Sequence, residues 1–320
     1  MKTIIRIVAA VLSLSLLPAF AQNYPSKPVH VIVGFVPGTA TDILARVLGQ
    51  KLAEIWGQSV VSENRAGAGS SIAAAAVAKS APDGAMLLFN SSAQSINPAL
   101  YASLPYDTTK DFVDITAVAG QPNVLVVSPA SSIKSVADLI AEAKAKPGQI
   151  NFGSAGVGTG THLNLEKFKL ATGVDVTHIP YKGTPEVVTD IIGGRTTAYF
   201  APISAAISLI QGEKLRALAV SSAKRSSLLP NVSTVAEAGV PGFEFMLWFG
   251  LWGPAGMPPA VVDKIYKDTT RALASVDVRE QFIKLGSEPI NMAPAEFGKF
   301  VRKEIEDNAR IIKAAGIKAQ

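Results

Sequence analysis

Two stretches of the chain contain the residues expected of an anion-binding turn. Each has a β-strand, a glycine-bearing turn and the start of a helix in succession, over residues 29–42 and 150–162. The first N–H groups of a helix have no partner within the helix, and the helix dipole adds partial positive charge there. Two such helix ends facing one cleft would bind a carboxylate without a cationic side chain. The pattern therefore indicates capture of a small acid rather than chemistry upon it.

Asp42, at the start of the first helix, is a candidate general base. However, Thr39-Ala40-Thr41-Asp42 also matches a capping box, in which Thr39 caps the helix and Asp42 reaches back. We favour the cap, because an aspartate beside a bound carboxylate would repel it unless the side chain faces away, orders water or accepts from an amine or hydroxyl of the ligand. Its predicted role in binding is indirect or concerns substrate selection.

The second turn combines glycines with small hydroxylated residues. Ser154, Thr159 and Thr161 suit direct hydrogen bonds to carboxylate oxygens. His162 is a ligand-contacting donor, a general base or a residue packed beside the turn, and packing is the leading interpretation for a lone histidine. The glycines also suggest a dinucleotide-binding turn, but the third required small residue is Thr161 or Leu163, depending on the starting glycine.

Sequence motifs of several other functions are missing. The three histidines lack the close spacing of metal ligands, and the sequence has neither a G-x-S-x-G elbow nor a P-loop. The 30 basic and 25 acidic residues are scattered, without the basic runs interleaved with aromatics that nucleic-acid binding favours. We therefore predict no catalytic residue, no metal and no cofactor.

Strands and helices alternate along the chain, which predicts an α/β fold with parallel-rich sheets. Apolar residues at helical spacing predict a helix over 43–55, for example. Two further loops follow predicted strands and are expected near the turns. Ser91 follows the strand 86–90, while Tyr181 and Lys182 follow the strand 176–179. A solvated side chain is the alternative for Lys182.

Two long apolar stretches interrupt this alternation, at 115–127 and 245–252. We interpret them as two strands that cross between lobes. This interpretation places domain 1 at 22–122 and 246–320 and domain 2 at 123–245. Two amphipathic helices in the tail, containing residues 261–273 and 297–312, are expected to pack on domain 1. A domain inserted through two strands predicts a hinge that closes around a ligand.

The N-terminus matches a secretory signal peptide. Lys2 and Arg6 come first, an apolar run covers 7–17, and Ala19 and Ala21 form a cleavage site. The run is shorter than the roughly 20 residues of a membrane span. The sequence has no cysteine, so it has neither disulfides nor a cysteine for a lipid anchor. We expect removal of residues 1–21 and export to the periplasm as a free monomer.

Ordered motifs throughout the mature chain resemble the Bug family, the solute receptors of tripartite tricarboxylate transporters. The similarity covers essentially the whole mature chain. The motifs lie at 24–28, 35–42, 63–65, 81–84, 97–100, 152–159, 162–163, 180–183, 215–220, 234–239 and 253–258.

The resemblance implies a two-lobed, type II-like periplasmic binding protein that holds a ligand carboxylate by backbone amides and hydroxyls, partly through ordered waters. The first lobe would contribute Phe35, Gly38, Thr39, Ala40 and Asp42. The second lobe would contribute Ser154, Gly158, Thr159, Thr161 and His162, with Tyr181, Lys182 and Gly183 from the neighbouring loop. The family usually has glycine at Thr39, and proline, glycine and asparagine at Ala66, Ser70 and Ser71, so the ligand's identity does not transfer.

We therefore predict a receptor that captures a dicarboxylate, an aromatic carboxylate or an amino acid. Closure would let the membrane permease subunits of a tripartite tricarboxylate-type transporter recognise the liganded form. One alternative keeps the fold but presents the ligand to a sensor kinase. Another is a secreted hydrolase that uses Asp42 or His162, although the sequence has no recognisable set of nucleophile, base and orienting residue.

Overall fold

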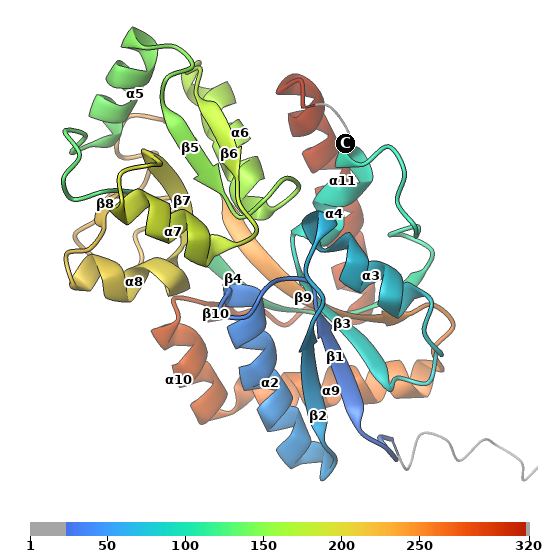
Figure 1. Cartoon of the computed structure of the whole chain (residues 1–320). Helices are drawn as coiled ribbons and strands as arrows, with labels where there is room; N and C mark the ends of the chain where they lie inside the picture. Colours follow the sequence, from blue (N-terminus) through green and yellow to red (C-terminus); the bar gives the residue numbers. More distant parts are fainter. Residues whose placement is uncertain (1–23, 318–320) are drawn as a thin grey trace, which may run out of the picture.

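The computed structural model describes residues 24–317, so the predicted signal peptide lies outside the described residues. Within this range, helices and strands alternate through both halves of the chain (Figure 1). None of the described helices is long and apolar enough to cross a membrane.

The first sheet is built from the two ends of the chain, in the strand order β2-β1-β3-β9-β4. Strand β1 pairs in parallel with β2 and β3, whereas β9 is antiparallel to β3 and β4. The bounds are β1 Val29–Val33, β2 Val60–Asn64, β3 Met86–Ser91, β4 Phe112–Val127, β9 Met246–Pro254 and the short β10 Glu288–Pro289, which pairs with β4. The helices between the first strands are α2 Ala40–Trp56, α3 Ser71–Ala78, with a 3₁₀ turn at Ala68–Ser70 before it, and α4 Ala93–Leu100.

The second sheet is built from the middle of the chain and continues from the end of β4. Its order is β4-β7-β5-β6, with β8 also on β4, and β5 is parallel to both β6 and β7. The strands are β5 Asn151–Ser154, β6 Thr177–Pro180, β7 Ala198–Pro202 and β8 Arg216–Val220. The helices are α5 Val136–Ala145, α6 Gly160–Thr172, α7 Thr184–Ile192 and α8 Ile203–Gln211.

Strand β4 belongs to both sheets. It pairs with β9 through Pro122 and with β7 from Asn123 onward. The second apolar stretch, 245–252, was expected to be a strand that crosses between the lobes, and here the structure differs. Strand β9 begins at Met246 and pairs only within the first sheet, and Phe245 N donates to Ser221 O at the junction between the sheets. We propose these two points as the boundaries of a first lobe (24–122 and 246–317) and a second lobe (123–245).

Three helices follow β9, where the sequence predicted two. They are α9 Pro259–Ala274, α10 Val276–Lys284 and α11 Pro294–Ala314. Helix α10 was missed because only Val278 and Phe282 of it are buried, too few to make an apolar stripe. Helix α11 packs on α4 and also reaches α6, where Leu163 and Ile312 share an apolar cluster that joins the two lobes (Figure 1).

Candidate functional site

Helix α2 is capped by Thr39. Its extended backbone (φ −77°, ψ 160°) lets Oγ1 accept from Asp42 N at 3.4 Å while the hydroxyl donates to Val36 O at 2.9 Å. Gly38 has φ 83°, a left-handed conformation that side chains disfavour. Its N–H donates to Asp42 Oδ2 at 3.0 Å. The predicted capping box is therefore modified, since Asp42 reaches back to Gly38 instead of Thr39.

Helix α6 in the second lobe begins with the same pattern. Thr159 (φ −89°, ψ 159°) accepts from His162 N at 3.3 Å and donates to Gly156 O at 2.8 Å. Gly158 has φ 77°, and its N–H donates to His162 Nδ1 at 3.4 Å. His162 therefore has the place in the second turn that Asp42 has in the first. The two turns are built alike, with an anionic brace in one and an imidazole in the other.

The next two N–H groups in each helix are free. Those of Ala40 and Thr41 in α2, and of Gly160 and Thr161 in α6, have no hydrogen-bond partner among residues 24–317. All four residues line one small cavity of about 30 Å³. The two helix N-termini therefore meet at a common point, where their orphan donors and dipoles favour an anion. Ser91 lines the same cavity.

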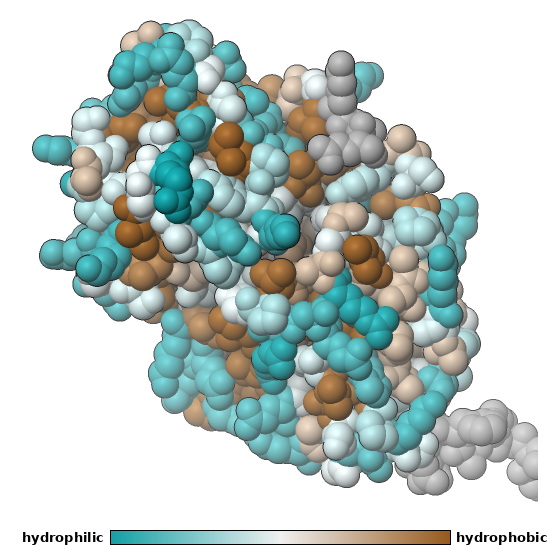
Figure 2. Space-filling model, in the orientation of Figure 1, coloured by the Kyte–Doolittle hydropathy of each residue, from teal (hydrophilic) through white to brown (hydrophobic). Residues whose placement is uncertain are grey.

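A larger cavity of about 460 Å³ lies beside the small one and shares Phe35, Ala155 and Thr159 with it. Its walls come from both lobes, with the loop 66–70 on one side and the loop 180–182 on the other. Figure 2 looks onto the face where the lobes meet, and apolar side chains are scattered among polar ones along this seam. The cleft thus has an inner compartment for an anionic group and an outer chamber for the rest of a small molecule.

Charged side chains are scarce around this cleft. Among the described residues that line either cavity, none is an aspartate or a glutamate, and Lys182 is the single cation. Lys182 is exposed and forms no ion pair within residues 24–317. No group of three or more His, Asp or Glu side chains in the described range could hold a metal ion. Negative charge in the inner compartment would therefore be met mainly by backbone N–H groups.

Asp42 is buried behind the first turn, and both of its oxygens are engaged. Oδ1 accepts from Arg46 Nε at 2.9 Å and from Asn64 Nδ2 at 2.8 Å, and Oδ2 accepts from Gly38. Burial alone would raise the pKa of Asp42, but these hydrogen bonds and the charge of Arg46 outweigh it and lower the pKa. Asp42 thus stays ionised, is compensated by Arg46 and braces the turn. The structure favours the indirect role.

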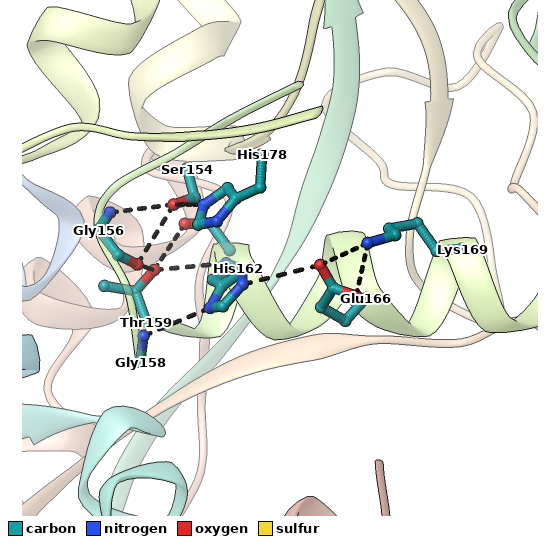
Figure 3. Close-up of polar contacts among 9 residues, drawn as sticks. Ser154, Gly156, Gly158, Thr159, His162, Glu166, Lys169 and His178 are labelled. Atoms are coloured by element: carbon teal, nitrogen blue, oxygen red, sulfur yellow. Dashed lines mark hydrogen bonds and ion pairs between the residues drawn. The ribbon is translucent and has the colours of Figure 1, made fainter. Parts of the chain in front are cut away.

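His162 and His178 stack behind the second turn, with ring centroids 4.0 Å apart and planes 9° from parallel (Figure 3). Burial, with a smaller effect of His178 and Lys169, lowers the pKa of His162 to about 3. Burial, followed by Lys169, lowers that of His178 to about 4. Glu166 lies 3.7 Å from His162 Nε2, but Lys169 holds it at 3.0 Å and offsets its charge. Both imidazoles are therefore neutral at pH 7.

Ser154 links this histidine pair to the turn. Its Oγ lies 2.6 Å from His178 Nε2, accepts from Gly156 N at 3.1 Å and contacts Gly156 O at 3.2 Å (Figure 3). The side chain is fully buried and lines neither cavity. The direct ligand contact expected of Ser154 has no geometric support. Its hydroxyl fixes the loop whose backbone faces the cleft.

The structure brings most of the predicted site residues to this cleft and puts the rest directly behind it. Those lining a cavity are Phe35, Thr39, Ala40, Ser91, Thr159, Thr161, Tyr181 and Lys182. Those that support the turns from behind are Gly38, Asp42, Ser154, Gly158 and His162. Gly183 lies at a contact between the lobes, where an added Cβ would be 2.7 Å from Val36 Cγ2.

Sequence reasoning missed several parts of the lining, among them Pro202, Leu247 and Phe249 in the inner compartment. Two others concern the outer chamber. One is the loop 66–70, whose glycines Gly67 (φ 131°) and Gly69 (φ 60°) are a signal that could have been used, since they follow the strand β2 as the other glycine turns follow theirs. The other is Tyr101, directly after α4. No local pattern identifies Tyr101, because its position depends on how α4 packs against the loop 66–70.

Comparisons with known proteins agree with this geometry. A family model described as "Tripartite tricarboxylate transporter family receptor" matches residues 44–317. Protein BugT of Bordetella pertussis is 38% identical over 303 residues, covering 94% of this chain and 93% of BugT. R. palustris Rpa4515 with adipate has a TM-score of 0.89 and 34% identity, covering 93% of this chain and 100% of that one. The periplasmic binding protein BugD has a TM-score of 0.88 and 32% identity, covering 93% and 100%.

Proposed function

The chain belongs to the tripartite tricarboxylate transporter receptor family, and from this premise we propose that it captures a small organic acid between its lobes. One observation carries the proposal. The four residues with these unpaired N–H groups, two at the start of α2 and two at the start of α6, line the same compartment of about 30 Å³. Each helix end contributes roughly 0.3 to 1 kcal/mol toward an anion, and up to ~2 kcal/mol when sheltered. Adipate in the structure of Rpa4515 supports a carboxylate as the ligand class.

The residues that a hydrolase would use are engaged elsewhere. Asp42 accepts three hydrogen bonds and is bound by Arg46, and His162 Nδ1 accepts from Gly158. Neither Asp42 nor His162 lines a cavity, so neither is placed to act on a bound molecule. Binding without turnover is the function that these contacts support.

We further propose that the protein acts in the periplasm as a monomer and hands its ligand to permease subunits of a tripartite tricarboxylate-type transporter. Closure of the lobes would create the surface that the permease recognises, since the cleft is walled by both lobes. The candidate signal peptide supports export.

Binding should require the carboxylate charge. In isothermal titration calorimetry, adipate is expected to bind at least about 100-fold more tightly than adipamide. The amide lacks the negative charge, and its own N–H groups would face the N–H groups of the helix ends. The panel should also contain aromatic acids and amino acids with their amides, so that the result does not depend on one carbon skeleton. Equal affinity of acids and amides would contradict the anion mechanism.

The approach of the two lobes should depend on the absence of a side chain at Gly183. Its backbone is extended (φ −178°), so alanine causes no backbone strain, but the new Cβ would lie 2.7 Å from Val36 Cγ2 on the first lobe. Gly183→Ala is therefore expected to weaken adipate binding by about tenfold. The double variant Val36→Ala/Gly183→Ala should recover the affinity of Val36→Ala alone. Unchanged affinity of the single variant would show that this contact does not limit closure.

A further inference from the structure

The outer chamber has hydrogen-bond donors that no residue uses. Building on the proposed function, we infer that Tyr101 and Ser70 form a subsite that binds a second carboxylate at the far end of the captured acid. Both residues lie on the first lobe and line the chamber of about 460 Å³. Neither belongs to the turns that begin α2 and α6. Tyr101 is thus a specificity-determining residue, while the helix ends bind the first carboxylate.

Tyr101 supplies a free phenol. It follows α4 directly, its ring is half-buried, and its hydroxyl has no hydrogen-bond partner among residues 24–317. Burial raises the pKa of Tyr101, so the hydroxyl remains a proton donor at neutral pH. A donor that faces a cavity and lacks a partner in the protein is available to an acceptor on a ligand.

Ser70 supplies the second donor. It is almost fully buried and has a left-handed backbone (φ 77°, ψ 1°), which is rare for a residue with a side chain. Ser70 Oγ accepts from Asn90 Nδ2 at 2.9 Å and does not cap α3, so the hydroxyl proton has no acceptor within the described range. A strained residue that is held by its neighbours and lines a pocket is typical of a binding position.

Neighbouring atoms fix this subsite in place. Asn97 Nδ2 donates to Gly69 O at 2.9 Å, which ties α4 to the loop 66–70. A Cβ at Gly69 would lie 3.0 Å from Tyr101 Oη, 3.0 Å from Asn97 Oδ1 and 3.1 Å from Val157 O of the second lobe. The phenol is therefore at the place where the lobes meet. A ligand that reaches the phenol lies between the two lobes.

The chemistry of the lining selects the occupant. Two hydroxyl donors and the exposed ammonium of Lys182 favour an acceptor with negative charge. No carboxylate in the described lining would compensate a cationic group on the ligand. A second carboxylate is the group that uses all three donors, whereas an apolar ligand end would leave the two hydroxyls without a partner.

The test compares straight-chain diacids from succinate to suberate with monoacids of equal carbon number, by calorimetry on the full mature protein. In the unmodified protein, the best diacid is expected to bind about tenfold or more tightly than its monoacid. Tyr101→Phe, which removes one oxygen, should abolish most of this preference by weakening diacid binding much more than monoacid binding. Ser70→Ala should reduce the preference in the same direction. Tyr266→Phe is the matched control, because Tyr266 on α9 is also half-buried and lines neither cavity.

Three results would overturn the inference. The first is the absence of a diacid preference, and the second is a preference that survives in Tyr101→Phe. The third is an equal loss for diacid and monoacid in Tyr101→Phe, which would give the phenol a purely structural role. In all three cases binding of monoacids still supports the proposed function. If no acid in either series binds, the proposed function and this inference both fail.

Discussion

Replacing Ala40 with proline is expected to weaken adipate binding by more than about 100-fold while the protein stays folded. Ala40 is the first residue of α2, and Thr39 before it is extended, a conformation that proline accepts in its neighbour. Proline at this position removes one of the four free N–H groups, and its ring replaces that N–H on a residue that lines the compartment. The measurement is calorimetry with adipate alongside thermal unfolding.

Val276→Pro is the matched control for this variant. Val276 is the first residue of α10, is 71% exposed and also follows a residue with extended backbone, Ser275 (ψ 142°). We expect both variants to unfold within about 2 °C of the unmodified protein, and Val276→Pro to bind normally. A folded Ala40→Pro protein that bound adipate with near-normal affinity would contradict the role of the helix ends.

Acidification should destabilise the protein strongly through the stacked histidines. In the unfolded chain each imidazole titrates near pH 6.5, whereas in the fold the pKa is about 3 for His162 and about 4 for His178. Between these limits the unfolded state binds more protons, so stability is complete above about pH 6.5 and falls as the pH decreases. The expected loss between pH 7 and about pH 4.5 is on the order of 3 to 5 kcal/mol. Urea unfolding at several pH values measures it.

Two conservative changes separate this effect from general acid denaturation. In His162→Asn the amide oxygen can replace Nδ1 as acceptor for Gly158, and in His178→Gln the amide can replace Nε2 at Ser154. The double variant should flatten the pH profile between pH 7 and about pH 4.5. The control is His30→Gln, which replaces the third histidine, located on β1 and paired with Glu63, and leaves the stacked pair intact. A steep profile that persists in the double variant would assign the acid sensitivity to other groups.

Much of the fold follows from local sequence patterns. The α/β class and the membership in the Bug family are confirmed, because strand, turn and helix signals are local and occur in order. The pairing of β9 was not predictable in the same way. Its apolar residues identify a strand, but only long-range pairing with β3 and β4 decides which sheet it joins. The division into lobes stays a prediction that the pairing change at Pro122 and Asn123 supports.

The candidate site was predictable where it depends on single turns. Thr39 caps its helix as the sequence indicated, since capping needs only a few consecutive residues. Thr159 was expected as a ligand contact, and the structure shows that it caps α6 in the same way. The roles of the residues behind the turns were harder, and His178 was seen only as part of a strand because its stacking on His162 joins two separate elements. The place of Tyr101 in the site could not be predicted for the same reason, because it depends on the packing of two separate segments. The set of ligand-binding residues stays a prediction until a ligand is bound.

The inner compartment also implies a choice among anions by shape. The compartment of about 30 Å³ is much smaller than the outer chamber of about 460 Å³. A carboxylate is flat and would bring two oxygens between the two helix ends, whereas a sulfonate or phosphate group carries its oxygens in a tetrahedron that needs depth in a third direction. Charge alone would attract all of these groups, and a phosphate with its second charge most strongly. We expect the thickness of the headgroup to decide which of these anions bind. Planar carboxylates should therefore bind more tightly than sulfonates or phosphates of similar chain length.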